Sequence, residues 1–77
     1  RGMERYWCLR WLLQENIHIA DAAVIKENLV KFDRLPLTIR VPSLPDLAPG
    51  TAVTLEISQI DLIERSLNAT FRGKSEN

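Results

Sequence analysis

The sequence has few of the residues from which catalytic and metal sites are built. It holds one histidine and one cysteine, and its three glycines are scattered rather than gathered in a loop that could cradle a phosphate. His18 and Cys8 alone are too few ligands for a zinc site. A lone cysteine also excludes an internal disulfide and is typical of a reducing compartment, so we expect a cytoplasmic protein. On these residues alone, the chain is not expected to be a catalyst.

Charge of one sign and long apolar runs are missing as well. Ten Lys and Arg balance ten Asp and Glu over 77 residues, which argues against nucleic-acid binding by bulk charge but permits a local basic face. No apolar run approaches the ~20 residues of a membrane span, and no signal peptide is visible. The apolar fraction of 45% is ordinary, so one small folded domain is expected. Since the sequence begins with Arg1 rather than Met, we expect a processed product or a piece of a longer protein.

The first pattern that is present is that of a helix. Residues 3–15 contain no Gly, no Pro and no β-branched residue. Apolar side chains recur there at four-residue intervals on adjacent stripes and cover well over half of the helix surface, more than a small barrel can bury. Residues 1–16 are therefore expected to be a helix from the end of another domain, placed between two bodies. The side chains expected to dock it are Met3, Tyr6, Trp7 and Trp11.

The remainder of the chain has the pattern of short strands. Apolar and polar residues alternate after Pro36 and again after Thr51, where a change of phase near Ile60 is typical of a β-bulge. About five short strands, with no helix left to cover a flat sheet, predict a small closed barrel. The predicted fold is mainly β, a five-stranded OB-fold barrel over residues 17–73 after the N-terminal helix, with residues 74–77 as a frayed tail. An SH3-like barrel fits the pattern nearly as well.

The charged residues are unevenly distributed, and the candidate binding residues lie mostly in the more basic half. Residues 1–40 hold seven Lys or Arg against five Asp or Glu, whereas residues 41–77 hold three against five. An aromatic ring flanked by cations on one barrel face is the composition that stacks bases and follows phosphates. Phe32 alternates with Val30, so packing in the core is the alternative for its ring. The candidate RNA-binding residues are Lys31, Phe32, Arg34, Arg40 and Arg72.

Two stretches together resemble the C-terminal end of the ribonuclease II family. The first is the aromatic helix Met3-Glu-Arg-Tyr-Trp-Cys-Leu-Arg-Trp-Leu-Leu, and the second is the run of alternating apolar residues that Gly50 opens and Ile60-Asp61 closes. The resemblance covers essentially the whole chain and implies the last helix of a catalytic domain followed by a C-terminal OB-fold. It implies a parent that degrades RNA from the 3′ end with a divalent cation such as magnesium. The metal-binding aspartates and the assisting arginine of that family belong upstream, so no catalytic role transfers to this chain.

One functional hypothesis and two alternatives follow. The leading hypothesis is a C-terminal fragment of a ribonuclease II-like 3′-to-5′ exoribonuclease that guides single-stranded RNA towards the catalytic channel. The first alternative is a structural barrel that caps the catalytic domain, docked by the aromatic helix and without RNA contact. The second is an interaction barrel unrelated to any nuclease. The expected partners are single-stranded RNA and the rest of the catalytic domain, and the isolated fragment is expected to self-associate through Trp7 and Trp11.

Overall fold

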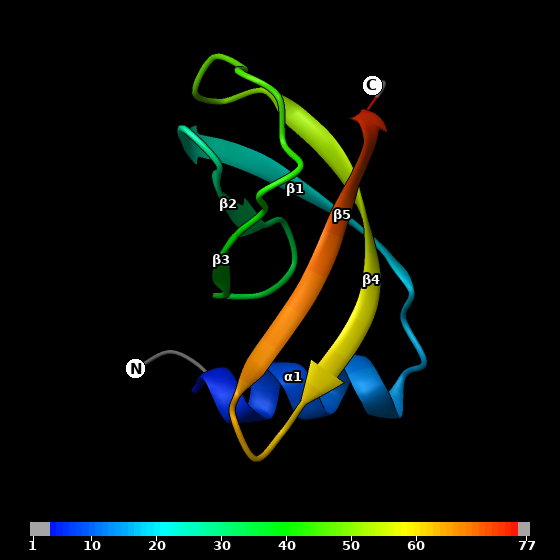
Figure 1. Ribbon diagram of the computed structural model, residues 1–77. Helices are drawn as coiled ribbons and strands as arrows, with labels where there is room; N and C mark the ends of the chain where they lie inside the picture. The colour runs from blue at the N-terminus through cyan, green and yellow to red at the C-terminus, as the bar shows by residue number, and fades with distance from the viewer. Residues whose placement is uncertain (1–3, 76–77) are drawn as a thin grey trace.

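The computed structural model describes residues 4–75, and within them one helix precedes a single antiparallel sheet. The elements are α1 (Arg5–Gln14), β1 (Ile19–Lys26), β2 (Leu29–Phe32), β3 (Thr38–Arg40), β4 (Ala52–Asp61) and β5 (Ser66–Lys74). The strand order is β3-β2-β1-β4-β5. The sheet curls into a half-barrel, and α1 lies across one end of it (Figure 1). This confirms the predicted fold class, a mainly β chain with one N-terminal helix and five curled strands in the manner of a small OB-like barrel.

The C-terminal end of α1 is a Schellman motif that sends the chain back against the helix. Asn16 has a left-handed φ of 56°, which asparagine tolerates better than most residues. Its N–H donates to the carbonyl oxygen of Leu13 at 3.1 Å, and the N–H of Ile17 donates to that of Leu12 at 3.0 Å. The reversal brings Ile17 beside Leu12, where both line one cavity, and β1 begins two residues later.

One face of α1 completes the barrel core. Cys8 and Leu9 are fully buried and Leu12 is 2% exposed, in the same cluster as the inward side chains of the strands. Burial of each of the two leucines stabilises the fold by roughly 1.5–3 kcal/mol. Trp7, on the opposite side of α1, remains 52% exposed, and Leu13, on its flank, remains 48% exposed. The barrel therefore covers one face of the helix and leaves an apolar part of its surface open.

The inward side chains of the strands follow the predicted alternation. Those of β2, β3, β4 and β5 that are buried are Val30, Phe32, Ile39, Val53, Leu55, Ile57, Leu67 and Ala69. The predicted change of phase in β4 is confirmed as an irregularity in its register with β5 between Ile57 and Gln59. The bulge turns the last residues of β4 relative to the first, which bends the strand around the barrel.

The gap between the two outer strands, β3 and β5, is bridged by side chains. Ser43, in the proline-rich connector after β3, accepts a hydrogen bond at its Oγ from the N–H of Phe71 at 3.0 Å. From α1, Arg5 donates through Nε to the carbonyl oxygen of Arg65 at 2.7 Å and through Nη1 to that of Thr38 at 3.2 Å. One arginine thus joins the helix, the β3 edge and the β4–β5 turn. At this end of the barrel it links the two edges that strand pairing leaves unjoined.

The C-terminal end of the barrel extends further than predicted. β5 continues through Lys74, which pairs with Val53, and the N–H of Ser75 donates to the carbonyl oxygen of Ala52 at 2.9 Å. The expectation of a frayed tail over residues 74–77 is therefore wrong for the first two positions, because β4 is long enough to pair with them; residues 76 and 77 lie outside the described residues.

Candidate nucleic-acid interface

Three of the predicted cations lie on the β2–β3 hairpin. Lys31 is on β2 opposite Thr38, and Arg40 is on β3 opposite Leu29. Because strand side chains alternate between faces and Val30 and Ile39 are buried, Lys31 and Arg40 share the outer face of the hairpin. Arg34 lies in the connection that follows β2. All three side chains are exposed; the structure brings Lys31 and Arg40 together on one face, and Arg34 lies beyond the end of β2.

None of these three cations is paired with a carboxylate within residues 4–75. Lys31 and Arg34 make no side-chain hydrogen bond there, and Arg40 donates through Nη1 to Oδ1 of Asn28 at 3.1 Å. An amide oxygen orients a guanidinium without neutralising its charge. Asn28 lies in the β1–β2 turn, where Glu27 has a left-handed φ of 49°. The hairpin and the connection after β2 therefore present three positive charges that form no ion pair within residues 4–75.

Two of the predicted residues do not belong to this surface. Phe32 is 2% exposed and packs in the core, since it alternates with Lys31, so the prediction that its ring stacks on bases is wrong. Arg72 lies on β5, which is separated from β2 by β1 and β4. Its Nη1 donates to Oε1 of Glu56 at 2.7 Å. The structure does not bring Arg72 to the other cations.

The aromatic residues expected to dock the helix divide into two groups, while Met3 lies outside the described residues. The ring of Trp7 meets that of Tyr6 edge-on, with centroids 5.2 Å apart, and the guanidinium of Arg10 lies 5.5 Å from the Trp7 ring centroid. Trp11, one turn further along α1, is half-buried against the barrel core. Only the Trp7 side of the helix therefore remains open in the way that docking to another body requires.

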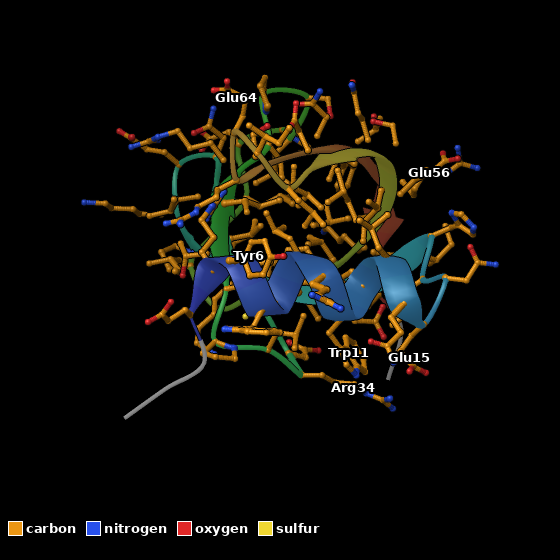
Figure 2. All side chains as sticks on the ribbon, turned by 90° about the horizontal axis from the view of Figure 1, so that it is seen from below. Tyr6, Trp11, Glu15, Arg34, Glu56 and Glu64 are labelled. Atoms are coloured by element: carbon orange, nitrogen blue, oxygen red, sulfur yellow. The ribbon has the colours of Figure 1, made fainter. Side chains whose placement is uncertain are left out.

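A cavity of about 460 Å³ opens between α1 and the β2–β3 connection. Its apolar wall includes Trp11, Ile17 and Ile19, and its lining also includes Asp33 and Arg34. Figure 2 shows Trp11 and Arg34 on the same side of α1. The volume lies within the range of about 300–1,000 Å³ that is usual for small-molecule sites. We call this cavity the Trp11 pocket; it adjoins the cationic hairpin because Arg34 belongs to both.

Two residues of the pocket were not found by reasoning from the sequence. Trp11 was expected to dock against a second body, and Asp33 was not singled out. The one available signal is Asn16 followed by an apolar residue, which is typical of a helix end that folds back on its last turn. No sequence pattern places the β2–β3 connection beside that turn, because the contact joins positions some twenty residues apart.

The barrel positions on which the family resemblance rests have structural roles. Asp61 accepts two hydrogen bonds at Oδ1, from the N–H groups of Ile63 and Glu64, both at 3.0 Å. This arrangement closes the β4–β5 turn, as aspartate commonly does. Gly50 has a φ of 91° and donates its N–H to the carbonyl oxygen of Val24 at 2.7 Å. Its left-handed backbone tethers the connector to β1 just before β4 begins.

Cys8 is not a reactive group in this arrangement. Burial raises the pKa of its thiol above the ordinary value, and the nearby Arg5 guanidinium lowers it by less. The thiol therefore stays protonated at neutral pH, whereas nucleophilic attack and metal binding both need the thiolate.

Residues 4–75 also bear on metal binding and on membrane insertion. No group of three or more His, Cys, Asp or Glu is placed there to hold a metal ion, so the cation implied for the parent enzyme finds no ligand set in the part described. No helix in the same range is long and apolar enough to cross a membrane.

Comparison with known proteins adds no relative. No protein-family model matches the sequence, and neither the curated proteins nor the solved structures contain a match to it. Function is therefore inferred from the residues and the geometry of the hairpin and the pocket.

Proposed function

We propose that this chain is the C-terminal part of a ribonuclease II-like 3′-to-5′ exoribonuclease and binds single-stranded RNA on the outer face of the β2–β3 hairpin. The supporting observation is that Lys31, Arg34 and Arg40 lie along this hairpin, exposed and without a carboxylate partner within residues 4–75. Strands 2 and 3 of OB-folds, with the adjoining loops, are the surface on which such barrels bind oligonucleotides. The location and the residue types thus favour the same ligand.

The binding mechanism is electrostatic tracking of the RNA backbone. Lys31 and the position opposite Arg40 are two residues apart on β2, which corresponds to about 7 Å along a strand. A row of cations at that spacing can follow the phosphates of an extended single strand. Each phosphate neutralised releases counterions and contributes about −0.7 to the slope of log K against log salt, so three contacts give a slope of about −2.

In the parent enzyme the hairpin would guide RNA rather than cut it. Hydrolysis would belong to the upstream catalytic domain, with its divalent cation, that the resemblance implies. The hairpin would raise the local concentration of single-stranded RNA and orient it towards the channel. The proposal includes the cytoplasmic location expected from the lone cysteine.

The test is a titration of the chain with fluorescein-labelled oligo-A, followed by anisotropy at low and moderate salt. The Lys31→Ala/Arg34→Ala variant is compared with Arg72→Ala/Lys74→Ala, which removes the same charge from β5. We expect the hairpin variant to lose at least tenfold in affinity and to show a slope smaller in magnitude by about 1.4, whereas the β5 variant keeps both. Equal losses in the two variants, or wild-type binding that is absent or insensitive to salt, would overturn the proposal.

The capping alternative is favoured by a different observation, the exposure of Trp7 on the outer side of α1. In that case the barrel stabilises the catalytic domain and α1 is its docking device. The Lys31→Ala/Arg34→Ala/Arg40→Ala variant of the full enzyme separates the two functions. Lost RNA affinity with unchanged melting supports guidance, and lowered melting with unchanged affinity supports capping.

A further inference from the structure

We propose that the Trp11 pocket holds one nucleotide of the bound RNA, with its base against the indole of Trp11, and that Asp33 favours bases that carry an amino group. The inference rests on the proposed function, because Arg34 belongs both to the pocket and to the cationic hairpin. It goes beyond that function by naming a site for a base and a preference among bases.

The indole of Trp11 is available to a ligand. Its side chain is half-buried and lines an open cavity. The ring of Trp7 is engaged by Tyr6 and Arg10, whereas no aromatic pair and no cation–π contact is found for the ring of Trp11 within residues 4–75. Unpaired RNA bases stack on such rings because every base has a π-face. Trp11 is thus the aromatic surface that Phe32, buried in the core, does not provide.

The rest of the cavity suits a flat ring with a polar edge. Ile17 and Ile19 extend the apolar wall beyond the indole, and Ile19 is 53% exposed in the unliganded chain. The cavity volume of about 460 Å³ is of the size that encloses a small organic group. An apolar wall buries the faces of a base, and its polar edge then requires partners at the charged end.

One carboxylate and one guanidinium are free to meet that edge and the adjoining phosphate. Neither Asp33 nor Arg34 makes a side-chain hydrogen bond or an ion pair within residues 4–75. The carboxylate of Asp21, also at the cavity, is occupied at Oδ1 by the hydroxyls of Thr54, at 3.1 Å, and Ser75, at 3.2 Å. Neutral hydroxyls do not cancel the charge of Asp21, so Asp21, Asp33 and Arg34 give the lining a formal charge of −1, and a phosphate is expected only at the Arg34 end.

These two groups determine which nucleotide is favoured. A guanidinium binds a phosphate through two parallel hydrogen bonds. A carboxylate accepts hydrogen bonds from an amino group such as N4 of cytosine, and it repels the carbonyl oxygen that uracil carries at the same position. Asp33 is held in place by its own N–H, which donates to the carbonyl oxygen of Asp21 at 3.1 Å. The pocket should therefore prefer cytosine to uracil. A cationic side chain from a partner protein is the other occupant that this lining admits, and the apolar wall of Trp11, Ile17 and Ile19, which suits a flat ring, favours the base.

The test uses the Trp7→Phe chain, so that fluorescence reports on Trp11 alone, titrated with oligo-C and oligo-U of equal length. We expect oligo-C to quench Trp11 and to bind about tenfold more tightly than oligo-U. Asp33→Asn should remove most of that preference and retain binding through the hairpin, whereas the matched control Asp46→Asn, in the exposed connector, should leave it unchanged. Both substitutions are at exposed positions, so neither is expected to disturb the packing of the core.

The possible failures are distinguishable. If both oligonucleotides bind equally well without quenching Trp11, the pocket inference is overturned and the proposed function stands. If neither binds, both are overturned. Quenching of Trp11 by spermidine but not by oligo-C would identify a site for cations and would also contradict the inference.

Discussion

The two hairpins of the barrel carry similar residues and use them differently. On β4–β5, Arg72 is paired with Glu56 and Asp61 closes the turn. On β2–β3, Lys31 and Arg34 have no such partner within the described residues. The long strands of β4–β5 share an extended register, whereas β2 and β3 are short. The comparison teaches that a charge count does not locate a binding surface; what locates it is whether each charge is already satisfied within the fold.

The largest expected effect separates core from surface on these two hairpins. Leu55→Ala removes a fully buried side chain from β4 and should lower the free energy of unfolding by about 2–5 kcal/mol. Lys31→Ala, at an exposed position of β2, should change it by no more than about 0.5 kcal/mol. Urea unfolding followed by circular dichroism measures both. A large loss for Lys31→Ala would mean that the cation supports the fold, and the contrast between the hairpins would fail.

The second prediction tests the bridge between the hairpins. Arg5→Ala removes both hydrogen bonds that join α1 to Thr38 and to Arg65, and the free energy of unfolding should fall by about 1–3 kcal/mol. Amide hydrogen exchange should accelerate more in β3 than in the middle of β4. Arg10→Ala is the control, since the ring of Trp7 is the contact found for that guanidinium. Equal effects of the two substitutions would show that the bridge does not hold the edges together.

A smaller effect concerns the turn of the β4–β5 hairpin. Asp61→Ala leaves the N–H groups of Ile63 and Glu64 without their acceptor, and we expect a loss of about 1 kcal/mol. Glu64→Ala, in the same turn, should have little effect on thermal melting. If RNA affinity falls while melting is unchanged, Asp61 serves ligand binding. The claim that β4–β5 uses its charged residues only within the fold would then be wrong.

The smallest effect tests α1, which spans the end of the barrel where the two hairpins meet. The pKa of Cys8 is raised in the folded chain, so the unfolded chain loses its proton first as pH rises. The stabilisation by the neutral thiol is fully present below the ordinary value of 9.0 and is lost as pH rises above it. The free energy of unfolding of Cys8→Ala should therefore fall less steeply with rising pH than that of the parent chain. Urea denaturation at a series of pH values measures both, and identical slopes would contradict the burial of the thiol.

Local pattern was sufficient for most of the fold and insufficient for most of the site. Alternation predicted the buried row Val53, Leu55 and Ile57 and the bulge after it, because a two-residue period is a property of neighbouring positions. The same period allowed two positions for Phe32, inward or outward. The ring points inward because its burial stabilises a small barrel, and an exposed phenyl ring would lose that stabilisation. The Trp11 pocket depends on a contact between the helix end and the β2–β3 connection, which no local pattern contains.

The most direct test of the central claim is to map the RNA on the barrel. Amide chemical shifts of the ¹⁵N-labelled chain, recorded while oligo-A is added at low salt, report which residues the ligand approaches. The account predicts that shifts gather in residues 29–40 and in the last turn of α1, with residues 66–74 little changed. Shifts centred on β4–β5, or none at oligonucleotide concentrations that saturate binding, would contradict it.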